Sequence, residues 1–189
     1  MIAYADAAAL ERTRTSGRAT FFSRSRKAPW VKGETSGNFV DVREVRFDGA
    51  RTPAPGVLRA IEACSFVVIG PSNPYVSIDP ILCLDGVRDA IARKPVIAVS
   101  PIVRGAAVKG PLAAMIGDLR GEAPSAGAVA RHYGGLLRAM VVERGDERTV
   151  TSLSVPSMRV LGASTVMRSR DDRLRLAHEV LAFAAEAAR

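Results

Sequence analysis

The sequence predicts an α/β protein built on a Rossmann-like parallel sheet with helices on its faces. Two short runs of apolar, mostly β-branched residues, at 65–70 and 95–100, have the pattern of strands buried on both faces. Each run is followed by a polar loop and then by a stretch with helical periodicity, and this alternation is typical of parallel sheets. The third observation is that residues 171–188 have the clearest helical pattern in the chain.

The start of the chain predicts a short amino-terminal α+β segment. Residues 4–18 favour a helix, residues 19–23 a strand, and residues 24–38, which are polar and rich in glycine and serine, a loop or hairpin. Residues 39–48 alternate apolar and polar side chains, but the alternation slips near Val42. We therefore expect a strand there with an irregularity in its pairing.

The rest of the chain predicts the strand–loop–helix units of the main body. A helix over 55–64 is expected to bury one face, formed by Val57, Leu58, Ile61 and Cys64. One face of the last helix is expected to carry Leu174, Ala177, Leu181 and Ala184, with Leu176, Val180 and Phe183 beside them. The other expected elements are helices over 79–93, 111–119 and 124–133, strands over 136–144 and 158–162, and a loop over 101–110.

Length and composition bound the class of protein. With 189 residues the chain suits one domain, or one domain plus a short segment, and 48% hydrophobic with 24% charged residues is ordinary for a globular protein. No apolar run approaches the roughly 18–20 residues of a membrane span. Cys64 and Cys83 lack the number and spacing of a disulfide scaffold or a zinc site. The sequence therefore predicts a reduced, cytoplasmic protein without a membrane partner.

The net charge of +8 raises the question of an anionic partner. Only four of the 27 basic residues are lysine, and the basic residues are spread along the chain. This distribution favours an arginine-rich surface, or sites for anionic small molecules, over a nucleic-acid interface.

The first candidate site is the loop that follows residues 65–70, because ligands of parallel sheets bind at the carboxyl ends of the strands. Pro71 restricts the backbone, and Ser72, Asn73 and Ser77 offer hydroxyl and amide groups. These groups suit the polar edge of a nucleotide or a phosphate. The alternative is a rigid turn in which these side chains bond to their own backbone.

The second candidate site follows residues 95–100 and is expected to share a crevice with the first. Cations and free N–H groups ahead of a helix can hold an anion, although a solvated lysine is the alternative for the cation. Its candidate residues are Ser100 and Pro101 at the end of the strand, and Arg104, Lys109 and Gly110 before the next helix.

Other polar residues give weaker signals. The basic loop over 23–38 is either a phosphate-binding hairpin or a solvated one. His132 is expected to interact with the carboxyl end of a helix and His178 to lie on the surface. Cys64 and Cys83 are expected to be small core residues. No catalytic residue is assigned.

Residues 44–189 resemble the 2-phospho-L-lactate transferase family. The resemblance is carried by GPSNP, VSI and PIL after the first buried strand, by SPI and VKGP after the second, by SAGAVARHYGG, and by the closing LAHEVLAFA. It implies a Rossmann-like sheet and a place in the biosynthesis of the deazaflavin coenzyme factor 420. Because they match the family's substrate-pocket segments, four residues are carried over as binding residues, namely Ser72, Asn73, Ser77 and Ser100.

The resemblance also implies a reaction. A phospholactyl-type group passes from a guanosine-diphosphate-activated donor to the terminal hydroxyl of a deazariboflavin, GMP is released, and magnesium assists. The family's amino-terminal half carries a Gly-rich loop and an aspartate implicated in metal and deazaflavin binding, and we find no counterpart of either in this sequence. Enzymatic activity is therefore left open, and no metal ligand is assigned.

Residues 1–41 resemble the start of phosphoribosyl-AMP cyclohydrolase through the segment SRSRKAPWVKGETSGN. That family's aspartate-rich magnesium motif and three zinc-binding cysteines have no counterpart in this sequence. The sequence therefore predicts two parts, a cyclohydrolase-like segment over 1–43 and a partial transferase-like domain over 44–189, joined near residues 40–47.

Three functions stay open. The first is the transferase of factor 420 biosynthesis, the second is the phosphoribosyl-AMP cyclohydrolase of histidine biosynthesis, and the third is a non-catalytic nucleotide-binding fragment. An incomplete parallel sheet also leaves an exposed edge, which predicts a homo-oligomer.

Overall fold

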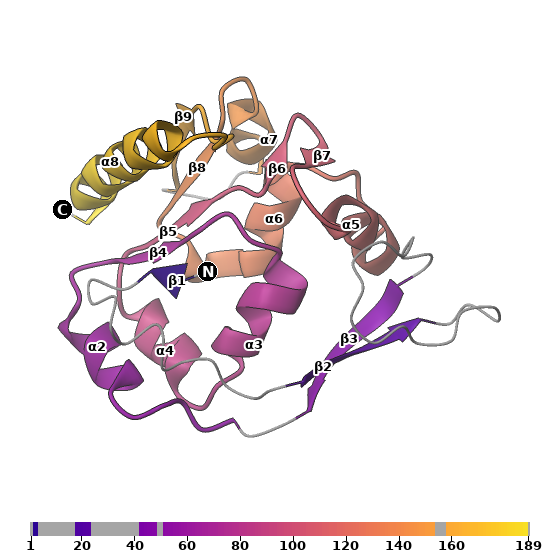
Figure 1. Cartoon of the computed structure of the whole chain (residues 1–189), viewed down its shortest axis with the longest axis vertical. Coiled ribbons are helices and arrows are strands. Elements are labelled where there is room, and N and C mark those ends of the chain that lie inside the picture. Colours follow the sequence, from indigo (N-terminus) through magenta and orange to yellow (C-terminus); the bar gives the residue numbers. More distant parts are fainter. Residues whose placement is uncertain (1, 4–17, 24–41, 49–50, 154–157, 189) are drawn as a thin grey trace.

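The computed structural model describes residues 2–3, 18–23, 42–48, 51–153 and 158–188, the first three ranges by their backbone alone. Its centre is a five-stranded sheet in the order β1-β4-β5-β8-β9 (Figure 1). Four strands are parallel, and these are β4 (Val67–Ile69), β5 (Val96–Val99), β8 (Ala139–Glu143) and β9 (Arg159–Ala163). The short strand β1 (Ile2–Ala3) pairs with β4 in the antiparallel direction. The predicted α/β class with a parallel sheet is confirmed.

The two buried strands on which the fold prediction depends are neighbours in the sheet. Val67 of β4 pairs with Val96 of β5, and Ile69 pairs with Ala98. Strand β5 is buried at every position because β4 and β8 flank it and helices cover both of its faces. The carboxyl ends of β4 and β5 therefore lie at the same edge of the sheet.

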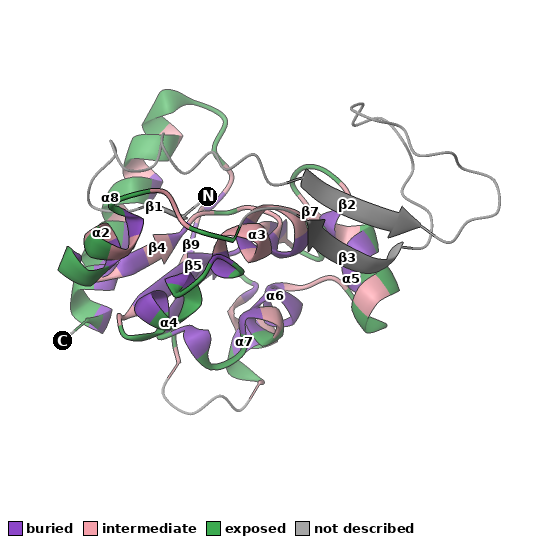
Figure 2. Cartoon of the chain, turned by 90° about the horizontal axis from the view of Figure 1, so that it is seen from below, coloured by how far each residue is buried: buried purple, intermediate pink, exposed green. Residues whose placement is uncertain are grey.

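Alternate strand residues belong to two separate cores, and the buried residues are purple in Figure 2. Val96 and Ala98 of β5 belong to the larger core, together with α2 (Val57–Ala63), α4 (Val87–Ala92), α5 (Leu112–Arg120) and α6 (Ala126–Tyr133). Ile97 and Val99 belong to the other core, which packs against α8 (Arg170–Ala187). This alternation explains why the strand has no polar face.

A separate antiparallel hairpin is formed by β2 (Arg18–Ser23) and β3 (Val42–Asp48), and β3 lies against α5. Phe22 pairs with Glu44, but Ser23 pairs with Val42, so the register shifts at this point. The predicted slip near Val42 is confirmed. Residues 4–17 and 24–41, on which a helix and a loop are expected, lie outside the described residues.

The prediction of one continuous helix over 79–93 is wrong. The chain is already helical in η2 (Pro74–Ile78), continues through α3 (Asp79–Leu82), and breaks before α4. Gly86 has a φ of 73°, in the left-handed region, and an α-helix cannot continue through that conformation.

The predicted inner face of the last helix is wrong as well. Leu174 is 48% exposed and Leu181 is 51% exposed. Ala184 of the predicted face is buried, but the rest of the buried face of α8 is formed by Leu176, Val180, Phe183 and Ala187. Both stripes are apolar at helical spacing, so periodicity alone could not decide which of them meets the sheet.

The loop expected over 101–110 contains a small hairpin made of β6 (Ile102–Val103) and β7 (Ala106–Ala107). The sequence prediction also lacks two short helices, η3 (Gly134–Leu136) and α7 (Glu147–Thr151). Elements this short contain too few residues to show a period. The other expected helices and strands of the main body are present with shifted ends.

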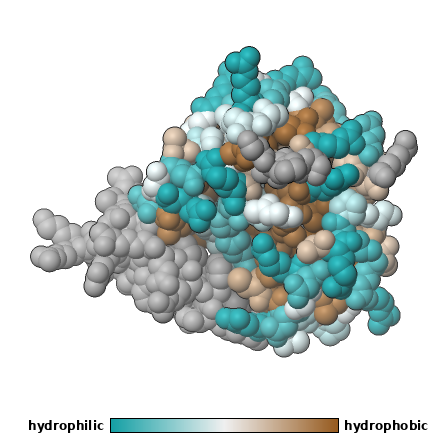
Figure 3. Space-filling view, turned by 180° about the vertical axis from the view of Figure 1, so that it is seen from behind, coloured by the Kyte–Doolittle hydropathy of each residue, from teal (hydrophilic) through white to brown (hydrophobic). Residues whose placement is uncertain are grey.

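The outer surface is mixed in polarity. From behind, apolar atoms gather near the centre of the visible face and polar side chains surround them (Figure 3). The large apolar side chains that are exposed in the described part of the chain are Val108, Met167, Leu174 and Leu181. No helix among the described residues is long and apolar enough to cross a bilayer.

Candidate functional site

The carboxyl edge of the parallel sheet is the place where ligands of this architecture bind. The residues that follow β4, β5, β8 and β9 meet there, since the four strands are parallel and neighbours.

At the end of β4, Asn73 is the cap of the helical segment η2. Its side-chain Oδ1 accepts hydrogen bonds from the backbone N–H groups of Tyr75 (3.0 Å) and Val76 (3.4 Å). Its Nδ2 lies 3.4 Å from Met115 Sδ of α5. The amide of Asn73 therefore holds its own turn and ties it to α5, as the structural alternative expects.

The two predicted serines near this turn have hydroxyl groups that are unpaired within the described part of the chain. Ser72 and Ser77 are half-buried, and among the described residues neither hydroxyl has a hydrogen-bond partner. Pro71 is exposed beside them.

At the end of β5, Ser100 is almost completely buried. Its Oγ donates to the carbonyl of Ile102 (2.9 Å) and accepts from the N–H of Ile102 (3.1 Å). The hydroxyl therefore turns the chain into the small β6–β7 hairpin. Pro101 is half-buried in the same turn.

Arg104 and Gly105 connect β6 to β7 as a two-residue turn. Both have positive φ, 50° for Arg104 and 78° for Gly105, which is the pattern of a type I′ hairpin turn. The backbone N–H of Arg104 donates to Asp146 Oδ2 at 2.7 Å, and the Asp146 side chain is buried. This contact joins the hairpin to the turn after β8.

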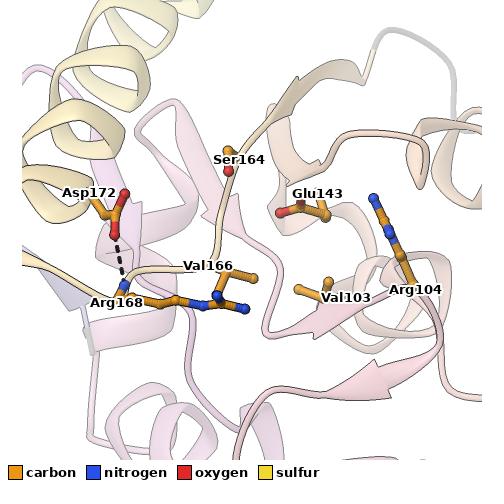
Figure 4. A pocket seen from close by; sticks show the side chains of 7 residues that line it. All are labelled: Val103, Arg104, Glu143, Ser164, Val166, Arg168 and Asp172. Carbon is orange, nitrogen blue, oxygen red and sulfur yellow. Dashed lines mark hydrogen bonds between the residues drawn. The ribbon is translucent and has the colours of Figure 1, made fainter.

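A cavity of about 450 Å³ opens between this hairpin and the ends of β8 and β9. Figure 4 shows its residues arriving from the hairpin, from β8, from the segment after β9 and from the start of α8. The lining residues are Val103, Arg104, Glu143, Ser164, Val166, Arg168 and Asp172.

Glu143 is the buried carboxylate of this cavity. It is the last residue of β8 and is only 9% exposed. Its Oε2 accepts hydrogen bonds from Thr165 N (2.7 Å) and Thr165 Oγ1 (2.9 Å). One oxygen thus ties β8 to the segment after β9, and the carboxylate still borders the cavity (Figure 4).

The α8 side of the cavity is fixed by a capping box. Asp172 Oδ2 accepts from the backbone N–H groups of Ser169 and Arg168, both at 2.9 Å, and Ser169 Oγ accepts from Asp172 N at 3.1 Å. The N–H groups of Ser169 and then Arg168 hold the pKa of the Asp172 carboxyl below its usual range. The start of α8 is therefore preorganised next to the cavity.

Arg104 is the residue that the sequence prediction and this cavity share. Lys109 and Gly110 are exposed and do not line the cavity. The sequence interpretation missed Glu143, Ser164, Thr165, Arg168 and Asp172. Glu143 could have been found from the sequence, because it is a charged residue at the end of an apolar run that forms a buried strand.

A second polar cluster lies between η2, α3 and α6, and it gives His132 a different partner from the predicted helix end. His132 Nε2 is 2.9 Å from Asp79 Oδ1, and its ring packs edge-on against Tyr75 with 4.4 Å between centroids. Burial raises the pKa of Tyr75 and, far more strongly, that of Tyr133. These contacts hold α6 against η2, and we assign them no catalytic role.

Magnesium, implied by the family resemblance, is not matched by a ready set of ligands. Among the described residues no group of three or more His, Cys, Asp or Glu side chains is placed to hold a metal ion. The buried carboxylates at the edge, Glu143 and Asp146, each accept hydrogen bonds from this chain. The described residues therefore do not fit a magnesium site, and we derive no step through the metal.

The fold and its polar edge define an α/β protein with an open parallel sheet and a ligand cavity at the carboxyl ends of its strands. Residues 18–160 match the family described as 2-phospho-L-lactate transferase CofD. The chain belongs to this family.

Individual relatives carry two names. The chain is 34% identical over 154 residues to the 2-phospho-L-lactate transferase of Methanococcus maripaludis, covering 82% of this chain and 48% of that protein. It is 38% identical over 160 residues to the phosphoenolpyruvate transferase of Streptomyces griseus, covering 83% and 50%. It is 50% identical over 101 residues to the protein of the same name from Thermobifida fusca, covering 53% and 31%. The chain thus spans about half the length, or less, of these curated relatives.

The family match corrects one expectation. It begins at residue 18, inside the segment that resembles phosphoribosyl-AMP cyclohydrolase, and it runs through the expected junction at 40–47. The comparisons give the cyclohydrolase resemblance no support, so that function is not pursued. The short segment SRSRKAPWVKGETSGN was too small a basis for a family assignment.

Proposed function

We propose that this chain takes part in the transfer of a phosphorylated three-carbon acid from a guanosine-diphosphate-activated donor to the terminal hydroxyl of a deazariboflavin, in the biosynthesis of factor 420. Membership of the family supports this reaction class. The names of the relatives leave two donors open, one built on 2-phospho-L-lactate and one on phosphoenolpyruvate.

The observation that carries the proposal is the meeting of Arg104, Glu143 and the start of α8 at one cavity on the carboxyl edge. In the transfer, the hydroxyl oxygen attacks phosphorus, the bond from that phosphorus to the oxygen of GMP breaks, and the hydroxyl proton is released. Charge on the phosphoryl oxygens must be offset by positioned cations or N–H donors. The guanidinium of Arg104 borders the space where such charge would lie (Figure 4).

Two other groups have roles in this proposal. The Glu143 carboxylate, anchored by Thr165, can accept a hydrogen bond from the attacking hydroxyl. We assign the nucleotide part of the donor to the turn after β4, where the hydroxyls of Ser72 and Ser77 have no partner among the described residues. The exposed Lys109 and Gly110 stay predictions as further anion contacts.

The test is a transfer assay with the purified chain, a deazariboflavin and each of the two activated donors in turn, with GMP measured by chromatography. We expect GMP and coupled product with one donor or both. Replacing Ser72 and Ser77 together by alanine should raise KM for the donor about thirtyfold, because each of the two lost hydrogen bonds is worth about 1 kcal/mol. The matched control is Ser152→Ala, an exposed serine beyond α7.

Two results would contradict the proposal. Failure of GDP to bind, together with no GMP from either donor, would remove both the nucleotide site and the reaction. Saturable binding of GDP and deazariboflavin without GMP release would replace the transferase by the non-catalytic nucleotide-binding alternative.

The homo-oligomer expected from an exposed sheet edge stays a prediction. Strand β9 is the terminal strand of the five-stranded sheet. Sedimentation velocity over a concentration series checks it, and a monomer that is independent of concentration would contradict it.

A further inference from the structure

Two arginines line the cavity, Arg104 from the hairpin side and Arg168 from the α8 side (Figure 4). Among the described residues neither guanidinium has an ion-pair or hydrogen-bond partner. Arg131 and Arg159, by contrast, are each paired with a glutamate on the surface. Two guanidinium groups that border one cavity and form no ion pair favour an anionic ligand.

Two carboxylates near the cavity accept hydrogen bonds from the backbones of these arginines. Asp146 accepts from the N–H of Arg104 at 2.7 Å, and Asp172 accepts from the N–H of Arg168 at 2.9 Å. Each carboxylate therefore fixes the backbone of an arginine and leaves its guanidinium group unpaired. Such an arrangement reduces the ordering cost of binding a ligand.

The turn does not explain why residue 104 is an arginine. A type I′ turn needs positive φ at both central residues and favours Asn-Gly. Arg104 holds a φ of 50° there, the only non-glycine residue with positive φ among those described. Holding a side chain of this size in a rarely adopted conformation costs free energy, and residues in such conformations cluster at functional sites.

The remaining lining residues restrict the size and chemistry of the ligand. The volume of about 450 Å³ lies in the lower part of the ~300–1,000 Å³ range of small-molecule pockets. Val103 and Val166 add apolar, β-branched surface beside the arginines. Two carboxylates, Glu143 and Asp172, also line it, and each already accepts hydrogen bonds from N–H groups of the chain. The cavity therefore combines two unpaired guanidinium groups with a small apolar wall, which suits a short acid with anionic groups on a hydrocarbon skeleton.

We propose that this cavity binds the phosphorylated three-carbon acid of the donor, with Arg104 and Arg168 on its phosphate and carboxylate groups and Val103 and Val166 against its carbon atoms. The assignment rests on the proposed function for the identity of the acid. The shared ligand chemistry is a phosphate and a carboxylate on adjacent positions of a three-carbon chain, as in 2-phospholactate and phosphoenolpyruvate. Arginine suits both groups, because its planar fork can bind either oxyanion through two hydrogen bonds.

The test is isothermal titration calorimetry of the full chain with four separate ligands: 2-phospholactate, phosphoenolpyruvate, inorganic phosphate and GMP. We expect at least one phosphorylated acid to bind more tightly than phosphate. Arg104→Ala and Arg168→Ala should each weaken that binding by about tenfold or more, which corresponds to about 1.4 kcal/mol. GMP affinity should change by less than about threefold, since GMP contains neither the phosphate nor the carboxylate of the acid.

The controls separate a lost contact from a lost fold. Arg88→Ala removes an exposed arginine of α4 that does not line the cavity, and it should leave acid affinity unchanged. Arg104→Asn removes the guanidinium while giving the turn the residue it prefers, so it should bind the acid as weakly as Arg104→Ala and unfold at no lower temperature than wild type.

The outcomes distinguish this inference from the proposed function. The inference is overturned if neither acid binds better than phosphate, or if both arginine variants keep wild-type acid affinity, even when GMP is released in the transfer assay. The inference stands if the acid binds more weakly to the arginine variants than to wild type, even when no GMP is released. In that case only the proposed function fails.

Discussion

The two ends of the carboxyl edge use their polar groups differently. In the turn after β4, Asn73 bonds to residues two and three positions further along the chain. In the cavity at β8 and β9, Arg104 is held by Asp146, 42 positions away, and Glu143 by Thr165, 22 positions away. The first region is built by local capping and the second by tertiary contacts. A polar loop in a sequence therefore indicates a turn more directly than it indicates a cavity.

The largest stability effect should come from the tertiary region, through Glu143→Ala. This change leaves the buried Thr165 N–H and hydroxyl without their acceptor, and hydrogen bonds to charged groups are worth about 1.5–3 kcal/mol. We expect the free energy of unfolding in urea to fall by about 2–3 kcal/mol. Glu143→Gln keeps an acceptor and should lose less than half as much. Equal stability of Glu143→Ala and wild type would show that this contact does not hold the edge together.

The local region should respond less, through Asn73→Ala. The change removes the side-chain acceptor at the start of η2, and loss of a cap costs about 1 kcal/mol. Asn73→Asp keeps the acceptor oxygen and should stay close to wild type in the same urea experiment. A loss larger than that of Glu143→Ala would reverse the comparison between the two regions.

A change of opposite sign is expected at Arg104. Arg104→Asn should raise the free energy of unfolding by about 0.5–1 kcal/mol, because asparagine tolerates the positive φ that arginine holds at some cost. Thermal unfolding checks it, with Arg104→Ala as the control that keeps the unfavourable conformation. A lower melting temperature for Arg104→Asn would show that the guanidinium stabilises the hairpin.

The smallest expected effect is on the stability of the fold at alkaline pH, through Tyr133. This residue follows His132, which packs against η2 near the turn after β4. Burial raises the Tyr133 pKa above its ordinary value of 10.0, so the folded chain keeps a proton that the unfolded chain loses. Stability should therefore fall as the pH rises above about 10. Tyr133→Phe cannot ionise, and its unfolding midpoint should fall less steeply between pH 9 and pH 11, a range set by that pKa of about 10. An equally steep fall of the unfolding midpoint with pH in wild type and Tyr133→Phe would contradict this prediction.

Sequence patterns were informative where burial is continuous. The apolar runs that became β4 and β5 predicted both strands and their adjacency, because a strand buried on two faces leaves little choice of residue. The slip near Val42 likewise appears as a register shift opposite Ser23.

The patterns failed where tertiary contacts decide. Leu174 and Leu181 have the spacing of a core face, but Leu176, Val180 and Phe183 are the residues that meet the sheet. In the candidate site, Arg104 was found because it follows a buried strand. Arg168 and Asp172 were not found, since nothing in the sequence places the start of α8 beside a hairpin more than 60 residues earlier.

The hydrogen bond between Arg104 and Asp146 also determines at which stage of folding the cavity forms. Its partners are 42 residues apart, so the pocket cannot form until β5, the hairpin and β8 have assembled. A ligand held there would engage only the completed fold and stabilise it by mass action, by about 2.7 kcal/mol at a hundredfold excess over its dissociation constant. Melting temperature measured against ligand concentration would thus report occupancy of this pocket independently of any turnover assay.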